Sequence, residues 1–231
     1  MTETTETQKD RLLDAILPHV AFDGWSNTAL RAAAKDLEMS KEEVRAACPR
    51  GAIDLAVAYH RRGDGRMVSE LAAKDLAGLR FRDRVAEALW LRVQTLDDRE
   101  AVRRASALFA LPMNAPEGAK LVWETADHIW TALGDTSRDI NWYTKRATLS
   151  AVWGAVVLFW LGDDSAGHSE TRAFIDRRID DVMQIEKAKA KLRDNPLTRP
   201  LAKLQEQLTG GIKAPDLDHL ADLPGHISGR K

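Results

Sequence analysis

The sequence has very little cysteine and no apolar run long enough to span a membrane. Cys48 is the sole cysteine among 231 residues, which excludes an internal disulfide and a metal site built from several thiolates. The uncharged run Ala147–Leu161 has 15 residues, whereas a membrane-spanning helix needs about 18–20. The N-terminal MTETTETQKD lacks the basic and apolar segments of a signal peptide and the arginine content of a transit peptide. These absences predict a protein of the cytoplasm.

An excess of charge of either sign is also absent. The chain carries 34 Lys and Arg against 35 Asp and Glu, so its net charge gives no argument for binding to nucleic acid. Hydrophobic residues make up 44% and charged residues 30% of the chain, as in ordinary globular proteins with a sizeable core.

Catalytic and metal-binding motifs are missing as well. The chain has no GxSxG, P-loop or dinucleotide-binding fingerprint, and its six histidines are scattered. Glu124, Asp127 and His128 share one helical face, but a di-iron bundle requires two Glu-x-x-His motifs, and the sequence has neither. We interpret the three as surface polar residues and expect no enzyme activity, metal or cofactor.

Strand patterns are nearly absent, and the fold class predicted is all-α. Period-2 alternation does not occur, whereas helical periodicity recurs between short Gly, Pro and Asp breaks. Helices are predicted at 11–22, 27–37, 41–47, 52–62, 68–79, 82–96, 100–110, 117–133, 139–164 and 169–192. Ser26 or Asn27 caps the second, and Ser40 with Glu43 forms a capping box on the third.

The helix predicted within 139–164 organises the rest of the chain. Its core stripe consists of residues at steps of three and four, namely Trp142, Arg146, Leu149, Trp153, Val156 and Trp160. From Ala151 on it is apolar all round, which predicts a helix buried inside the protein. The opposite face has small residues at Ala147, Ala151, Gly154 and Ala155, and we expect a neighbouring helix to pack closely there.

The N-terminal helices resemble the DNA-binding head of TetR-type regulators, with a helix–turn–helix from Thr28 to Ala47. A third helix of this kind would enter the major groove. From Asp36 to Arg50, however, four acidic residues oppose three basic ones, and the acidic side chains would repel the phosphates that dominate DNA affinity. We therefore predict a head that has lost DNA binding; the alternative is a TetR-type, ligand-responsive transcription regulator.

A second resemblance is more specific. Residues 108–179 resemble the Coq-nine family of ubiquinone-biosynthesis accessory proteins. The matching residues are Leu111-Pro112 with Asn114 and Pro116, Asp127, Trp130, Gly134-Asp135, Ser137, Asp139, Asn141-Trp142-Tyr143-Thr144, Arg146, Leu149, Thr171, Phe174 and Asp176-Arg177-Arg178-Ile179.

The resemblance implies a TetR-like helical bundle that does not bind nucleic acid. Its HTH-like head would comprise residues 10–63, after a disordered segment 1–9. A larger ligand-binding bundle would comprise residues 64–194. Proteins of this family bind an isoprenoid or quinone lipid and assist the di-iron hydroxylase that acts on demethoxyubiquinone. They form homodimers and are peripheral to the inner membrane. The function expected is a non-catalytic accessory protein that presents a lipid to the hydroxylase.

Three apolar helix faces are candidates for the lipid-binding surface. The residues predicted to contact lipid are Val85, Leu89, Val93, Val122, Ala126, Ile129, Trp153, Val156 and Trp160. Five of the seven tryptophans lie between Trp123 and Trp160, and such large rings suit both pocket walls and solid cores. The residues alone leave pocket and solid core open, and the resemblance favours a pocket.

The start of the central helix is the candidate partner-binding surface. Consecutive helical residues face about 100° apart, so Trp142 and Tyr143 cannot both enter the core, and an exposed aromatic pair is typical of a binding hot spot. We predict that Trp142, Tyr143 and Arg146, with Asp127 and Trp130, contact the hydroxylase. The alternative is a staple between the helix start and the preceding loop.

The C-terminal region has a separate pattern. Residues 195–212 form a predicted amphipathic helix whose apolar stripe consists of Leu197, Leu201, Leu204, Leu208 and Ile212, preceded by a cluster of basic residues. Such a helix could lie on an anionic membrane surface or dock back onto the protein, and the sequence leaves both open. Residues 213–231 are predicted to be disordered.

Overall fold

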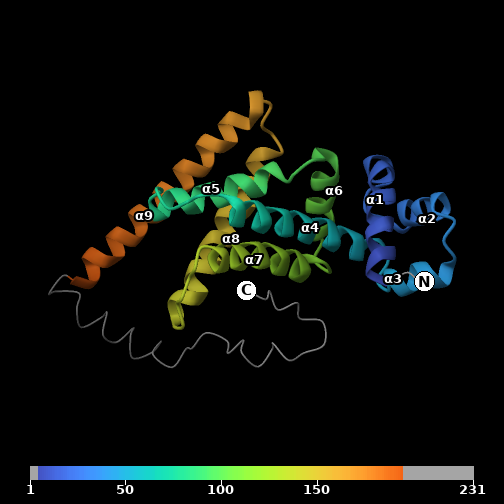
Figure 1. The fold of residues 1–231 in the computed structure, drawn as a ribbon, viewed down its shortest axis with the longest axis horizontal. Helices are drawn as coiled ribbons and strands as arrows, with labels where there is room; N and C mark the ends of the chain where they lie inside the picture. Colours follow the sequence, from blue (N-terminus) through green and yellow to red (C-terminus); the bar gives the residue numbers. More distant parts are fainter. Residues whose placement is uncertain (1–4, 195–231) are drawn as a thin grey trace.

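The protein is helical throughout the part that the structure describes. This computed structural model describes residues 5–194, with side chains up to residue 185, and contains no β-strand in that range. The helices, drawn in Figure 1, are α1 (Thr5–Asp23), α2 (Asn27–Asp36), α3 (Lys41–Ala47), α4 (Ala52–Ala73), α5 (Phe81–Gln94), α6 (Arg99–Ala110), α7 (Ala115–Ala132), α8 (Ile140–Trp160) and α9 (Ser169–Asp194). A short 3-10 turn, Ala166–His168, precedes α9. The prediction of an all-α fold is confirmed.

The first three helices form a head at one end of the molecule (Figure 1). Gly24 ends α1 in the left-handed conformation with φ 65°, which glycine adopts without a Cβ penalty. Ser26 accepts a hydrogen bond from the Ala29 amide at the start of α2, and Ser40 with Glu43 forms the predicted capping box of α3. The predicted helix–turn–helix layout is therefore present. α1 already includes residues 5–9, so the helix starts earlier than the sequence predicts.

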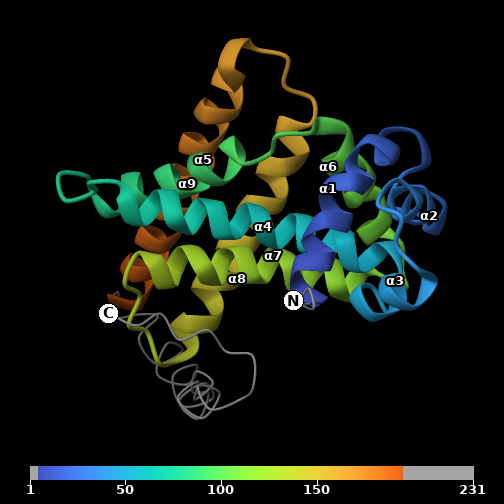
Figure 2. The same ribbon diagram turned by 45° about the vertical axis from the view of Figure 1, so that its right-hand side comes forward.

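The head has its own hydrophobic core, to which α6 contributes. The buried residues at its centre include Leu12, Leu13, Ile16 and Val20 of α1 and Leu30 of α2. Ala101 of α6 belongs to the same core, and its carbonyl accepts a hydrogen bond from the Trp25 indole at 3.0 Å. Figure 2 shows α6 standing beside α1. α6 therefore joins the head to the rest of the molecule.

Helix α4 runs without a break from the head into the larger bundle (Figure 1). The sequence predicts two helices here, 52–62 and 68–79, because glycines at 63 and 65 favour an interruption. This prediction is wrong: α4 continues to Ala73. A Cβ at Gly63 would lie 2.7 Å from an Arg92 nitrogen, so the glycine makes room for a buried guanidinium. The adjacent Asp64 pairs with that guanidinium at 2.6 Å, and this interaction compensates for the low helix propensity of glycine.

The two glycines of α4 should respond oppositely to alanine. Gly63→Ala should lower the free energy of unfolding by about 1–2 kcal/mol, because overpacking costs about 1–3 kcal/mol and the gain in helix propensity is about 1 kcal/mol. Gly65 has open space around its Cα, so Gly65→Ala should raise the same free energy by about 0.5–1 kcal/mol. Urea denaturation of both variants checks this. Stabilisation by Gly63→Ala would show that Arg92 is not held in place.

The larger bundle consists of α4, α5, α7, α8 and α9. α7 lies between α4 and α8, and α9 packs against both α5 and α8 (Figure 2). Its core contains Leu89, Ile129, Trp153 and Ile175, all at most 1% exposed. No helix among residues 5–194 is long and apolar enough to cross a membrane.

Helix α8 has the predicted start and the predicted core stripe. Asp139 caps it by accepting a hydrogen bond from the Asn141 amide, and Arg146, Leu149, Trp153, Val156 and Trp160 of the stripe are buried. The prediction that its second half is buried on all sides is wrong, since Leu158 is 68% exposed. The prediction of close packing at Gly154 is also wrong, because a Cβ there would meet no atom within 4 Å.

Candidate functional site

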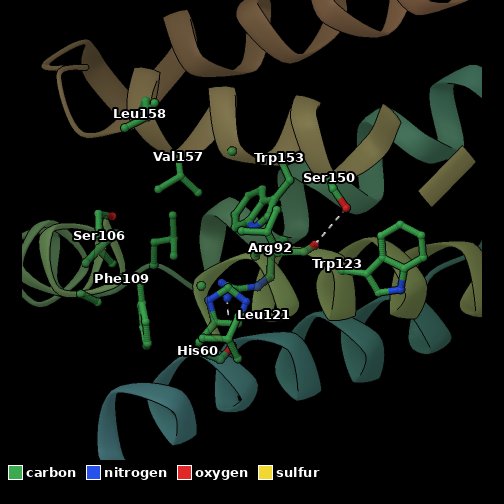
Figure 3. A pocket seen from close by; sticks show the side chains of 18 of the residues that line it. His60, Arg92, Ser106, Phe109, Leu121, Trp123, Ser150, Trp153, Val157 and Leu158 are labelled. Carbon is green, nitrogen blue, oxygen red and sulfur yellow. Dashed lines mark hydrogen bonds between the residues drawn. The ribbon is translucent and has the colours of Figure 1, made fainter. Parts of the chain in front are cut away.

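A cavity of about 650 Å³, open to solvent on one side, lies between α4, α5, α6, α7 and α8. Figure 3 shows Trp153 and Trp123 on one side of it and Phe109 and Ser106 of α6 on the other. Most of its lining is apolar, including Leu96, Val102, Leu121, Val122, Val157 and Leu158. A cavity of this size and polarity fits a ligand that is largely hydrocarbon.

Small residues on α7 and α8 help to create this space. Ala147 and Gly154 of α8 line the cavity, together with Gly118 and Ala119 of α7. The helix that lies opposite Gly154 stays too far away to touch it. The close helix contact occurs instead at Gly118, where a Cβ would lie 2.8 Å from the Cβ of Phe109. The small face of α8 therefore borders a cavity.

Two of the nine residues predicted to contact lipid line this cavity, namely Val122 and Trp153. The other seven lie in or against the hydrophobic core of the larger bundle: Val85, Leu89, Val93, Ala126, Ile129, Val156 and Trp160. These seven residues are in the core of the larger bundle and do not line the cavity. Lipid contact by Val122 and Trp153 stays a prediction.

Sequence reasoning missed the contribution of α6. Val102, Ala105, Ser106 and Phe109 all line the cavity, and their spacing of i, i+3, i+4 and i+7 places them on one helical face. The signal was therefore present in the sequence.

One end of the cavity is polar and contains a buried ion pair. The Arg92 guanidinium donates from Nε to Asp64 Oδ1 at 2.6 Å, from Nη1 to Thr95 Oγ1 at 2.9 Å and from Nη2 to the His60 carbonyl at 3.1 Å. It also lies 5.0 Å from the ring centroid of Trp153. Asp64 is fully buried and Arg92 is 2% exposed. The Asp64 carboxylate therefore offsets the charge of the Arg92 guanidinium.

The neighbouring histidines differ in their electrostatics. Burial lowers the pKa of His60 to about 4, so this side chain is neutral at physiological pH; its Nε2 lies 2.9 Å from the Thr125 hydroxyl. Burial raises the pKa of Asp64, but the interaction with His128 and the charge of Arg92 outweigh it and bring that pKa below its ordinary value. The same interaction raises the pKa of His128. Asp64 therefore stays ionised beside Arg92.

An aromatic cluster adjoins the cavity through Trp123. Its ring lines the cavity and also contacts Trp142 and Tyr143, with centroid distances of 5.8 and 6.5 Å. The rings of Trp142 and Tyr143 meet edge to face at 4.8 Å and are half-buried. Trp123, Trp142 and Tyr143, hereafter the aromatic cluster, thus connect the cavity to the surface at the start of α8.

The other residues predicted to contact a partner support this cluster from inside. Arg146 is 3% exposed and pairs with Asp127 at 2.5 Å and with Asp135 at 3.1 Å; its guanidinium also lies 4.0 Å from the Trp142 ring centroid. Trp130 is 9% exposed and donates its indole N–H to the Lys145 carbonyl. Their contact with a partner stays a prediction, and in this structure their interactions fix the start of α8.

Glu124, Asp127 and His128 of α7, whose shared helical face could suggest a metal site, interact instead with residues of other helices. Glu124 accepts two hydrogen bonds from Arg61, Asp127 pairs with Arg146, and His128 lies 3.6 Å from Asp64. Among residues 5–194, no group of three or more His, Cys, Asp or Glu side chains is arranged to hold a metal ion.

The model of the COQ9 family matches residues 115–186, a segment that includes α7, α8 and the aromatic cluster. The mitochondrial ubiquinone biosynthesis protein COQ9 of Drosophila melanogaster is 30% identical over 184 residues, covering 76% of this chain and 55% of the relative. The human COQ9 is 27% identical over 194 residues, covering 79% and 60%. A probable coq9 of Dictyostelium discoideum is 28% identical over 190 residues, covering 78% and 61%.

This chain is similar to the proteins of the COQ9 family. The similarity spans most of the chain but only 55–61% of the length of these three relatives. The segment that matches the family model contains all five residues predicted to contact a partner, Asp127, Trp130, Trp142, Tyr143 and Arg146, and it contains Val122 and Trp153 of the cavity. The resemblance predicted from the sequence is confirmed.

The fold is also that of a TetR regulator. The crystal structure of a TetR transcriptional regulator from Nitrosomonas europaea superposes with a TM-score of 0.60, covering 74% of this chain and 95% of that one. Sequence identity is 20%, so this likeness shows the fold alone. The predicted TetR-like bundle is confirmed.

Proposed function

We propose that this protein is a non-catalytic accessory protein of ubiquinone biosynthesis, which binds an isoprenoid or quinone lipid and presents it to a di-iron hydroxylase. The observation that carries the proposal is the 650 Å³ apolar cavity, which Trp123 connects to the aromatic cluster. The names of the related proteins support the pathway, since they are ubiquinone biosynthesis proteins. Purified protein should contain a long-chain lipid, which solvent extraction and mass spectrometry would detect.

The shape of the cavity supports a lipid rather than a compact metabolite. Its one charged lining group, the Arg92 guanidinium, lies at one end, where it already bonds to Asp64, Thr95 and the His60 carbonyl. The remaining walls are mostly aliphatic and aromatic, with hydroxyl groups at Ser106 and Ser150, and Ala147 and Leu158 of the lining are exposed. A ligand with a long hydrocarbon part gains free energy in proportion to the apolar area that it buries there.

The aromatic cluster supports transfer to a protein partner. Half-buried tryptophan and tyrosine side chains offer large apolar area at little cost in side-chain entropy, and such residues dominate binding hot spots. Because Trp123 contacts both the cavity and Trp142, a partner bound at the cluster would stand next to the lipid. The cluster would then serve as the partner's docking point.

Replacing Trp142 by alanine should weaken binding to the hydroxylase about tenfold or more, as truncation of a hot-spot aromatic costs about 2 kcal/mol. Pull-down of the purified hydroxylase, with the dissociation constant measured by titration, checks this. Phe22→Ala is a matched control, since Phe22 is an aromatic residue 84% exposed in the head. Unfolding of Trp142→Ala at a much lower temperature would favour the staple interpretation instead.

A TetR-type transcription regulator is the second candidate, which the shared fold favours. The acidic residues of α3 argue against DNA binding. Glu42 and Glu43 lie in the first turn of α3, where Glu43 bonds to the Ser40 amide and hydroxyl. Carboxylates on this element would repel DNA phosphates. We expect no shift of genomic DNA fragments in a gel at physiological salt, and a specific shift would support the regulator.

Homodimer formation and attachment to the inner membrane stay predictions of the family resemblance, and the cytoplasmic location stays a prediction from the sequence. The amphipathic stripe Leu197, Leu201, Leu204, Leu208 and Ile212 lies outside the described residues, as does 213–231. Co-sedimentation with anionic liposomes, comparing the full chain with one that ends at Asp194, would test the stripe. Equal sedimentation of both forms would reject membrane docking by this segment.

A further inference from the structure

One buried polar group at the cavity has no partner among the described residues. The Trp153 side chain is 1% exposed, and its indole Nε1 donates no hydrogen bond to any of their atoms. Buried indole N–H groups are nearly always hydrogen-bonded, as the Trp25 indole is to the Ala101 carbonyl. The orphaned N–H belongs to a residue that lines the cavity, which makes a ligand atom the natural acceptor.

The polar groups near Trp153 are bonded to other protein atoms. Figure 3 shows its ring directly above Arg92, with His60 beyond. Thr95 Oγ1 accepts from Arg92 and donates to the Arg92 carbonyl, and the Ser150 hydroxyl donates to the Val122 carbonyl. Three of the five N–H groups of the guanidinium donate to protein atoms. This end of the cavity is therefore rich in donors.

The charges at this end determine which acceptor fits. Asp64 already compensates the charge of Arg92, and His60 contributes none because burial brings its pKa to about 4. A carboxylate or phosphate would add an uncompensated buried charge, which is costly. An ammonium group would place donors against donors. A neutral oxygen, as in a ketone, quinone, ester or alcohol, meets neither penalty.

We propose that the Trp153 indole N–H donates a hydrogen bond to a neutral oxygen acceptor of the bound ligand, with its hydrocarbon part along the apolar walls. The inference rests on the proposed lipid-binding function and adds the class of headgroup. The ligand enters with this oxygen first and comes to rest beside Arg92. The exposed rim residues Ala147 and Leu158 then lie at the hydrocarbon end.

The test compares three probes with the same chain length: dodecan-2-one, dodecanoate and dodecylammonium. Each displaces the neutral fluorophore N-phenyl-1-naphthylamine from the purified full chain. The ketone should bind more tightly than either charged probe. Trp153→Phe removes the N–H and part of the ring, and should weaken ketone binding about three- to tenfold and binding of the fluorophore, which has no oxygen acceptor, by a smaller factor.

Trp90→Phe is the control, since Trp90 lies on α5 outside the cavity, where Arg172 covers its ring. It should change neither affinity. If ketone affinity is equal in Trp153→Phe and the unaltered protein while the fluorophore still binds, the headgroup inference fails and the lipid-binding proposal survives. Tighter binding of dodecanoate than of the ketone, which needs no variant, would also overturn the inference. If the unaltered protein binds neither fluorophore nor ketone, both proposals fail.

Discussion

Asp64→Asn should lower the free energy of unfolding by about 3–5 kcal/mol, because it leaves the Arg92 guanidinium buried without a counter-charge. Both partners are almost completely buried, so solvent cannot compensate. The carboxylate also accepts a hydrogen bond from the Thr125 hydroxyl at 2.9 Å and lies 3.6 Å from His60 and His128. Urea denaturation followed by circular dichroism measures the loss.

Two further variants distinguish the effect of this buried ion pair on stability from the effect of a surface ion pair. Asp14 pairs with Arg62 but is 69% exposed, so Asp14→Asn should change the free energy of unfolding by no more than about 1 kcal/mol. The double variant Asp64→Leu with Arg92→Met removes both charges, and should recover most of the loss since apolar replacements of buried pairs are often neutral. A small effect of Asp64→Asn, equal to that of Asp14→Asn, would contradict a buried pair.

Gly154→Phe should weaken lipid binding strongly without unfolding the protein. Gly154 lines the cavity, and a Cβ there would meet no atom within 4 Å, so the new ring would occupy space that we assign to the ligand. We expect the dissociation constant of an apolar ligand to rise about tenfold or more, equivalent to about 1.4 kcal/mol. The melting temperature should stay the same or rise, because glycine within a helix costs about 1 kcal/mol relative to alanine.

The matched control for this variant is Gly65→Phe. Gly65 is also a helical glycine at which a Cβ would meet no atom within 4 Å, but it is exposed on α4 and does not line the cavity. Gly65→Phe should leave ligand affinity unchanged. Equal affinities of the Gly154→Phe and Gly65→Phe variants would show that the ligand does not occupy the cavity.

Local signals in the sequence are sufficient to predict most of the helices. Asp139, Ser26 and Ser40 each provide a side chain that caps a helix start, and caps are determined by neighbouring residues. The continuity of α4 could not be predicted this way. Gly63 and Asp64 are tolerated in the helix because Arg92, 28 residues beyond Asp64, pairs with the carboxylate.

The position of the cavity was only partly predictable. An apolar helical stripe looks the same whether it faces a solid core or a cavity, which is why the sequence groups Val122 and Trp153 with core residues such as Leu89 and Val156. The difference depends on how far a neighbouring helix lies from the stripe. At Gly154 no neighbour is close enough to fill the space, and only the folded arrangement reveals this.

Mass spectrometry of lipid extracted from the purified protein tests the central claim most directly, with the unaltered chain, Gly154→Phe and Gly65→Phe prepared in parallel. A long-chain lipid with a neutral oxygen-bearing headgroup should be recovered from the unaltered chain and from Gly65→Phe. Gly154→Phe should yield little or none. Recovery of no lipid from the unaltered chain, or equal recovery from all three folded proteins, would contradict a lipid-binding cavity between α4 and α8.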